Sequence, residues 1–556
     1  MRRAITASRK SRYPRRFCRG FLPTGNRFMA HWFDDFGAPA PTTRRDFLRS
    51  AGTLSLGLAA GGLLLPSGAR AQSTTPKKGG HLILGLDTAS SSDRLDPAYY
   101  TESYLYTVGF QLYNTVLELD ENGKLVGALA ESWEPVKPDG SEWVFKLRKG
   151  IQFHNGKELN AQDVVYSLNH HRGADNPSGG KGPLIPVTDI RASAPYEVTI
   201  SLNAGNADFP YALVDYHFGI GPDGADFDKG VGTGAFILED FQPGVRALTK
   251  RNPNYWHPDR ANVDSVETIA MNDATARVAA LISGSVHIIN RVEPRTIALL
   301  SSRPGINIHG AKENTMFTFP MLTNVAPFDN LDLRLALKYA IDRQALQTSL
   351  LVGSGSIGND NPIASWNPYF AADIPQRPYD PDKARFHFQK SGFSGSLPLS
   401  VSDNGFPGSA DAAQLFQSSA AAAGITIDVN RVPSDGYWDE VWLKHPFCAS
   451  NWAVRPTADA MLSLIFQSQA PWNETAWKNA TFDKLLAAAR VELDDAKRKQ
   501  IYHDLQLQFV DEGGELIPVF ADNLAGASDK VAGFTNVPGG GDLSGYRVAE
   551  KVWLES

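Results

Sequence analysis

The segment 353–358 reads Gly-Ser-Gly-Ser-Ile-Gly and has the GxGxxG spacing of loops that bind dinucleotides. In such a loop the glycines let the backbone approach a pyrophosphate at the start of a helix, so the loop must join a strand to a helix. Here the segment follows a predicted helix and precedes a turn, Asn-Asp-Asn-Pro at 359–362. Residues 353–358 are therefore expected to form a flexible loop that binds no nucleotide. The glycine pair before Lys181 lacks the Ser or Thr of a phosphate-binding loop.

No other pattern in the sequence provides the residues that catalysis needs. The HExxH and GxSxG motifs and paired-cysteine metal spacings are absent. His170 and His171 are adjacent on a predicted helix and point to different sides, so we do not expect them to share a metal ion. The sequence thus predicts a protein that is not an enzyme and holds no cofactor. A metal site assembled from residues far apart in the chain stays open.

The N-terminal part has the order of parts that is typical of an export signal. Its apolar run, 51–65, is fifteen residues long and contains four glycines, whereas a helix that crosses a bilayer needs roughly 20 apolar residues. Arg44 and Arg45 precede the run in a segment that resembles the twin-arginine motif. Ala69 and Ala71 follow it as a cleavage site. We expect export to the periplasm by the twin-arginine machinery, with cleavage after Ala71.

Residues 1–28 precede this signal and carry nine Lys or Arg and no acidic residue. Such a run is typical of a disordered or nucleic-acid-binding tail. Met29, however, opens a signal of ordinary length, which favours Met29 over Met1 as the start of translation. N-terminal sequencing of the precursor would distinguish the two.

The mature chain is acidic and has a single cysteine. The leader takes 13 of the 54 basic and 3 of the 60 acidic residues, which leaves 41 and 57 and a formal net charge of −16. This balance argues against a nucleic-acid partner, because phosphates require a basic face. Cys18 leaves with the leader, so Cys448 cannot form an intrachain disulfide. The roughly 485 remaining residues are enough for two or three domains with cores of their own.

Short strand patterns alternate with amphipathic helices along the mature chain, which is typical of an α/β protein. Strands are expected at 81–86, 142–148, 286–289 and 425–429, and helices at 160–168, 275–283, 330–351, 380–391 and 411–423. Gly284, Gly392 and Gly424 each follow a predicted helix, at the position where glycine commonly ends one.

A series of ordered motifs resembles the extracellular solute-binding proteins of family 5, the peptide- and nickel-type receptors of ABC importers. The motifs lie at 95–97 (Leu-Asp-Pro), 130–134 (Ala-Glu-Ser-Trp-Glu), 143–156, 159–164, 231–236, 251–256, 327–329, 334–343, 379–384 and 392–393. The similarity covers essentially all of 78–550. Most of these motifs have an evident structural role in packing or turning, so they are not read as ligand contacts.

The resemblance implies the two-lobed periplasmic binding protein fold of the cluster C type, with an extra subdomain inserted in lobe one. Lobe one is expected at 72–115, 229–310 and 523–556, the inserted subdomain at 116–228, and lobe two at 311–522. Crossing strands would form the hinge between the lobes. A solute would be enclosed when the lobes close, and it would stabilise the closed form through its contacts there.

The family also implies where the ligand is contacted, because its peptide receptors hold the α-ammonium of the ligand with the aspartate of a Trp-x-x-Asp segment in lobe two. In this chain Trp452 is followed by Arg455 at that position and by Asp459 four residues later. A guanidinium binds a carboxylate with two hydrogen bonds, so Arg455 suits an anion and Asp459 an amine. Trp452 is a candidate apolar wall, and Tyr99 and Tyr100 are candidates from lobe one. The alternatives are a salt bridge between Arg455 and Asp459, and a place in the core for Trp452.

The expected function is that of a monomeric periplasmic receptor, which binds a di- or oligopeptide and presents it to the permease and ATPase subunits of an ABC importer. The alternative within this class is a non-peptide solute, such as an opine, an oligosaccharide, a nickel complex or haem. A third hypothesis is an exported enzyme or a chaperone-like binder built on the same scaffold.

Overall fold

The computed structural model describes residues 75–173, 176–434, 436–470 and 472–555. The export-signal residues Arg44, Arg45, Ala69 and Ala71 lie outside this part of the chain. Among the described residues, no helix combines the length and the apolarity that are needed to cross a bilayer.

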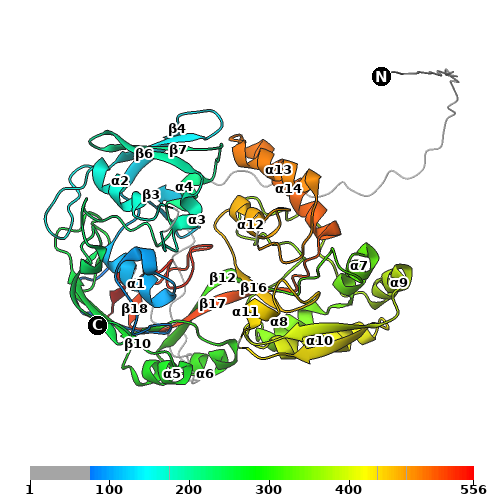
Figure 1. Ribbon diagram of the computed structural model, residues 1–556. Helices are drawn as coiled ribbons and strands as arrows, with labels where there is room; N and C mark the ends of the chain where they lie inside the picture. The colour runs from blue at the N-terminus through cyan, green and yellow to red at the C-terminus, as the bar shows by residue number, and fades with distance from the viewer. Residues whose placement is uncertain (1–74, 174–175, 435, 471, 556) are drawn as a thin grey trace, which may run out of the picture. The chain divides into compact units, whose positions relative to one another are not determined.

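The largest sheet has nine strands and brings together segments from both ends of the described chain (Figure 1). Its order is β16 (Ser450–Ala453), β12 (Ile306–Thr318), β17 (Val519–Ser528), β11 (Ile288–Ile289), β1 (His81–Leu86), β10 (Ser265–Ala270), β9 (Arg246–Arg251) and β8 (Phe236–Gln242), with β13 (Ser356–Ile357) paired to β17. The predicted first strand, 81–86, is confirmed as β1, which runs parallel to both β10 and β11. Its alternate side chains Leu82, Leu84 and Leu86 are fully buried in a core with α1 (Ser103–Leu112).

A separate four-stranded sheet contains β4 (Ala130–Pro135), β5 (Glu142–Leu147), β7 (Glu197–Leu202) and β6 (Val187–Ala194), in that order. Trp143, Phe145 and Leu147 are buried at alternate positions of β5, as the sequence pattern predicts. The helix α2 (Ala161–Asn169) begins with the expected cap, because Asn160 accepts a hydrogen bond from the Gln162 N–H and forms a capping box. These elements share a hydrophobic core of their own.

A third group of elements surrounds the parallel pair β14 (Ser396–Val401) and β15 (Thr426–Arg431). The helices here are α7 (Leu331–Ala340), α8 (Arg343–Leu350), α9 (Pro381–Ser391) and α10 (Ser409–Ala421). The predicted single helix over 330–351 is wrong, because the chain forms α7 and α8 instead. Ile341 adopts an extended conformation, and the Asp342 carboxylate caps α8 by accepting the Ala345 N–H.

The remaining helices include a fourth group, formed by α12 (Ala458–Ile465), α13 (Ala480–Val491) and α14 (Asp495–Glu512), which shares a core that contains Trp452. The smaller elements are η1 (Pro97–Tyr99), β2 (Leu117–Leu119), β3 (Leu125–Gly127), α3 (Lys181–Leu184), α4 (Phe209–Ala212), η2 (Phe227–Lys229), α5 (Ala274–Ser283), η3 (Pro294–Thr296), α6 (Ile297–Ser301), α11 (Tyr437–Glu440), β18 (Val531–Ala532), α15 (Val548–Lys551) and β19 (Trp553–Leu554).

Two long strands, β12 and β17, connect these cores (Figure 1). The first half of β12 packs with α5 and α6 through Ile306 and Ile308, whereas Met316 and Phe317 in its second half belong to the cores around α12 and β14. The pairing with β17 shifts register between Ala311 and Thr315. Such an irregularity bends the strand and disrupts the ladder locally. The lobe boundaries at 310/311 and 522/523 remain predictions.

The GxGxxG segment is a loop, as its flanking residues predict. Ser356 and Ile357 form the short strand β13 along the edge of β17, and no helix follows them. The Gly355 N–H donates to the Asp522 carboxylate, at 3.2 Å. This turn therefore fixes the strand crossing and lacks the strand–loop–helix order of a dinucleotide site.

Candidate ligand-binding site

A cavity of about 1660 Å³ lies among these cores. This volume exceeds the roughly 300–1,000 Å³ that is common for small-molecule pockets, so it can hold a ligand larger than one amino acid. We call the segments at 102–119, 206–217, 291–295 and 537–547 its first wall, and those at 403–415 and 451–464 its second wall. The crossing strands contribute 314–317 and 521–524 between the walls.

Three tyrosines form an aromatic part of the first wall. The rings of Tyr106 and Tyr216 stack with 3.6 Å between their centroids, and Tyr546 lies edge-on to both of them. Burial raises the pKa of Tyr216 to about 12, and the positive charge of Arg455 acts in the opposite direction. All three phenols are therefore neutral at physiological pH and can donate or accept hydrogen bonds.

Arg455 lies on the second wall, in the short connection between β16 and α12. Its side chain is half-buried, and within the described chain it makes no hydrogen bond and no ion pair. Its positive charge lowers the pKa of Tyr216 on the opposite wall, against the larger effect of burial. A half-buried guanidinium with five free N–H groups is suited to bind a carboxylate.

Asp459 also lines the second wall, but its carboxylate is already engaged. It accepts from the Arg490 Nε at 3.1 and 3.2 Å and from the Ser463 hydroxyl at 3.0 Å. The residue is 7% exposed. Burial raises the pKa of Asp459, and Arg490 opposes that effect. The alternative of a salt bridge between Arg455 and Asp459 is not what the structure has, because Asp459 pairs with Arg490.

Asp542 is a carboxyl of the first wall that the sequence analysis missed. It is 4% exposed, and its Oδ1 accepts the N–H of the next residue, Leu543, at 2.8 Å. Its Oδ2 has no hydrogen-bond partner among the described residues. Burial raises the pKa of Asp542 to about 7, against the opposing effects of this hydrogen bond and of Arg291. The only sequence signal was the run Gly-Gly-Gly-Asp at 539–542, which indicates a loop and no particular ligand.

Trp452 does not line the cavity and lies in the core beside α12, with 7% of its surface exposed. Its indole N–H donates to the Glu474 carboxylate at 2.7 Å. Trp442 and Ser450 donate to the other oxygen of the same carboxylate. The position of Trp452 therefore matches the core alternative.

Tyr99 and Tyr100 do not line the cavity either. Tyr100 is buried, and its hydroxyl donates to the Leu95 carbonyl at 2.8 Å. Tyr99 is exposed on the outside, with the Arg94 guanidinium 4.2 Å from its ring centroid. These contacts give the two tyrosines a role in fixing the segment that follows Asp96.

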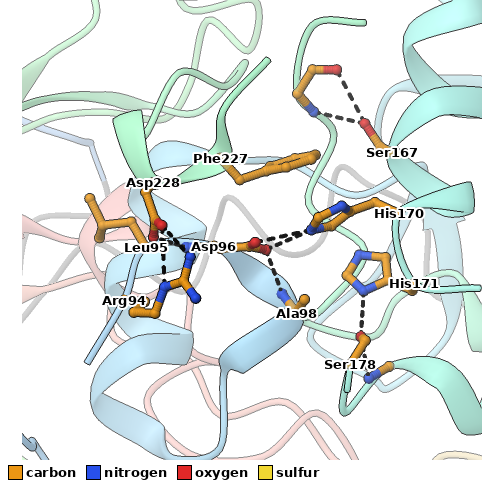
Figure 2. Close-up of polar contacts among 12 residues, drawn as sticks. Arg94, Leu95, Asp96, Ala98, Ser167, His170, His171, Ser178, Phe227 and Asp228 are labelled. Carbon is orange, nitrogen blue, oxygen red and sulfur yellow. Dashed lines mark hydrogen bonds and ion pairs between the residues drawn. The ribbon is translucent and has the colours of Figure 1, made fainter. Parts of the chain in front are cut away.

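Figure 2 shows how that segment is anchored. The Asp96 carboxylate caps η1 through the Ala98 N–H and accepts from the His170 Nε2 at 2.9 Å. The neighbouring His171 is bonded elsewhere, through its Nδ1 to the Ser178 hydroxyl. The two histidines thus have different partners. The prediction that they lie on a helix is wrong, because α2 ends at Asn169 and both follow its end.

These features define a two-walled cleft within an α/β fold, which is the architecture of a solute-binding protein. A sequence model described as "Bacterial extracellular solute-binding proteins, family 5 Middle" matches residues 124–474. The chain belongs to this family of bacterial extracellular solute-binding proteins.

Curated relatives and solved structures agree with this assignment. Di/tripeptide-binding protein 1 of Pseudomonas aeruginosa is 26% identical over 458 residues, which cover 74% of this chain and 84% of the relative. The dipeptide-binding protein of Escherichia coli is 24% identical over 542 residues, which cover 88% and 97%. The periplasmic binding protein DppA from Helicobacter pylori, solved in complex with the peptide STSA, superposes with a TM-score of 0.69 at 22% identity and covers 86% of this chain and 99% of its own. The chain therefore has the two-lobed fold of the periplasmic binding proteins.

Proposed function

We propose that the mature protein is the receptor of an ABC importer and that it binds a di- or oligopeptide between its two walls. The unpaired Arg455 guanidinium, in a cavity large enough for a short peptide, carries this proposal. A peptide supplies the C-terminal carboxylate that Arg455 can bind with two hydrogen bonds. The peptide-binding names of the relatives support the same ligand class. Receptor action needs no covalent step, and we expect no turnover of the ligand.

Ligand binding would act by stabilising the closed arrangement. Both walls contribute to the cavity, so a ligand that fills it contacts both and favours their approach. If the lobe boundaries are as predicted, the crossing strands β12 and β17 form the hinge. The closed form is then the shape that the permease recognises.

Contacts between the inserted segment and the α13–α14 region would also favour closure. The Arg498 guanidinium donates to the buried Asp208 carboxylate at 2.7 Å, and the Ala207 N–H donates to the Arg490 carbonyl at 2.8 Å. Asp208 belongs to the predicted inserted subdomain, whereas Arg490 and Arg498 belong to predicted lobe two. Such a contact lowers the free energy that the ligand must supply on binding.

A second candidate ligand is a non-peptide solute that carries a carboxylate, such as an opine. Arg455 favours it because a guanidinium recognises a carboxylate whatever the rest of the molecule is. The two candidates differ in whether the peptide bond contributes to affinity.

The localisation part of the proposal rests on residues outside the described chain. We expect the twin-arginine pair Arg44 and Arg45 to direct export, and cleavage after Ala71 to release the mature protein into the periplasm as a cofactor-free monomer. Replacing both arginines by lysine in the full chain should abolish export. A stoichiometric metal or chromophore in the purified mature protein would contradict the cofactor-free state.

A thermal-shift screen of the mature protein tests the function. The set should contain peptides of two to six residues, opines, oligosaccharides, haem and nickel–histidine. A ligand at 100 times its dissociation constant adds about 2.7 kcal/mol to the free energy of unfolding. Stabilisation by peptides, without their hydrolysis, is the expected result. Stabilisation by another class alone, or turnover, would overturn the peptide proposal.

A further inference from the structure

The carboxyl of Asp542 has the properties of a group that can bind a ligand. It is buried in the first wall, it lines the cavity, and only one of its two oxygens is hydrogen-bonded within the described chain. A buried carboxylate is normally stabilised by a cation or by several donors. Asp542 therefore has unused capacity to accept hydrogen bonds on the side that a ligand reaches.

The guanidiniums whose charge acts on Asp542 are engaged by other carboxylates. Arg291 lies 3.0 Å from the Glu102 carboxylate and 3.6 Å from that of Asp87. Arg277 lies 3.7 Å from Asp87, and the charges of Asp273 and Glu293 act on it as well. The carboxyls of this group thus outnumber its two guanidiniums when all are ionised. A cation at Asp542 would reduce this excess.

Around Arg455, positive charge is in excess. Behind the second wall, Arg490 pairs with Asp459 at 3.1 Å. Arg498 pairs with Asp208 at 2.6 Å. Each of these pairs cancels, whereas Arg455 has no carboxylate of its own in the described structure. An anion at Arg455 would balance the charge on this side.

Two tyrosines, Tyr216 and Tyr546, line the cavity together with Arg455 and Asp542. The charge of Arg455 acts on Tyr216, and the Tyr216 ring lies 6.1 Å from that of Tyr546. The Tyr546 N–H donates to the Asp542 carbonyl at 2.7 Å. Arg455 and Asp542 thus line opposite walls of the same cavity.

The backbone around Asp542 holds it in an unusual turn. Leu543, Ser544 and Tyr546 all have φ between 49° and 62°, and Gly545 has φ 72°. Left-handed conformations cost roughly 1–2 kcal/mol for each residue that is not glycine. Such strain is commonly found where a loop must present a group in a fixed position. Here it fixes the carboxyl of Asp542 at the wall of the cavity.

We infer that Asp542 binds the ammonium group of a zwitterionic ligand whose carboxylate is bound by Arg455. This inference rests on the proposed receptor function and assigns the cationic end of the ligand to the first wall, in place of Asp459. The ligand keeps its covalent structure, and only hydrogen bonds and ion pairs form. The distance between the two groups then selects the length of the ligand.

Isothermal titration with alanine peptides tests this assignment. Di-, tri- and tetraalanine are each titrated in free, N-acetylated and C-amidated form into the mature protein and its Asp542→Asn variant. N-acetylation removes the ammonium charge and should weaken binding to the parent about 10–100-fold. Asp542→Asn should weaken the free peptide by a similar factor and leave the acetylated peptide unchanged, because the two changes remove one interaction. Asp428→Asn, which removes an exposed carboxylate away from the cavity, is the matched control and should bind as the parent does.

The outcomes separate this inference from the function on which it rests. Binding of no alanine peptide and of no other peptide would overturn the proposal of a peptide ligand, and the inference with it. Tight binding of a free peptide that survives both N-acetylation and Asp542→Asn would overturn the inference alone. The effect of N-acetylation is measured on the parent protein, so the inference can still be tested if the Asp542→Asn variant misfolds.

Discussion

Asp459 and Asp542 are two buried aspartates of one cavity, on opposite walls, and they differ in what their carboxyls already contact. The Asp459 carboxylate is held by Arg490 and Ser463. The Asp542 carboxyl accepts a single backbone N–H. Exposure does not distinguish them, since the two residues are 7% and 4% exposed. The difference lies in Arg490, which the fold brings to Asp459 from 31 residues away.

The comparison indicates which carboxyl is structural and which can bind a ligand. A ligand ammonium at Asp459 would have to compete with a guanidinium that is already in place. At Asp542 it would add a hydrogen bond and a charge without displacing any group. The same contrast applies to the arginines, because Arg490 is paired with Asp459, whereas Arg455 forms no ion pair with any residue that the structure describes.

The largest expected effect comes from breaking the structural pair. Arg490→Met should lower the free energy of unfolding by about 3 kcal/mol, because the Asp459 carboxylate stays buried without its guanidinium. Arg455→Met, which breaks no ion pair, should change it by less than about 0.5 kcal/mol. Urea denaturation of the mature protein measures both. Equal losses for the two variants would contradict the distinction between the paired Arg490 and Arg455.

The next largest effect is expected in the way the affinity for a peptide depends on pH. The pKa of Asp542 is raised from its ordinary 3.8 to about 7 in the free protein. Its contribution to stability is therefore present below pH 3.8 and is lost as the pH rises through about 7. A ligand ammonium needs the ionised form, so affinity should fall as the pH falls, by up to about 100-fold between pH 7 and pH 5.

Titration of a free alanine peptide at the two pH values measures this dependence. Asp542→Asn should show a nearly flat profile over the same range, because its side chain does not titrate. An Asp459→Asn profile that is flat while that of Asp542→Asn stays steep would exchange the roles of the two aspartates.

A smaller effect is expected from changing the shape of the anion-binding group. Arg455→Lys keeps the positive charge but loses the paired N–H groups, so the affinity for a free peptide should fall about 10-fold. Arg455→Gln should cost more, since it also removes the charge. The C-amidated peptide is the control, because its affinity should change little in either variant. An unchanged affinity of the free peptide for Arg455→Gln would remove Arg455 from the site.

The smallest effect on binding is expected at Trp452, three residues before Arg455. Trp452→Phe removes the hydrogen bond to Glu474 and should lower the free energy of unfolding by about 1 kcal/mol. Affinity for the peptide should stay within about twofold of the parent, because Trp452 does not reach the cavity. A large loss of affinity with an unchanged stability would indicate that the indole contacts the ligand.

Most of the secondary structure follows from local patterns. The alternating Trp143, Phe145 and Leu147 predict β5, and the capping residue Asn160 predicts the start of α2. These features depend on side chains within a few residues of one another. The helix predicted over 330–351 is interrupted because the Asp342 side chain caps a second helix. The spacing of the leucines alone does not reveal this interruption.

The sequence by itself determined the class of fold, the acidic character of residues 72–556, and the position of Arg455 beside the expected binding segment. Only the tertiary structure decided which groups are free to bind. Arg490 comes to Asp459 from 31 residues away, and the loop of Asp542 reaches the cavity from the far end of the chain. The reason is that the state of a buried charge depends on the charges and donors packed around it, and these come from segments whose proximity no local pattern specifies.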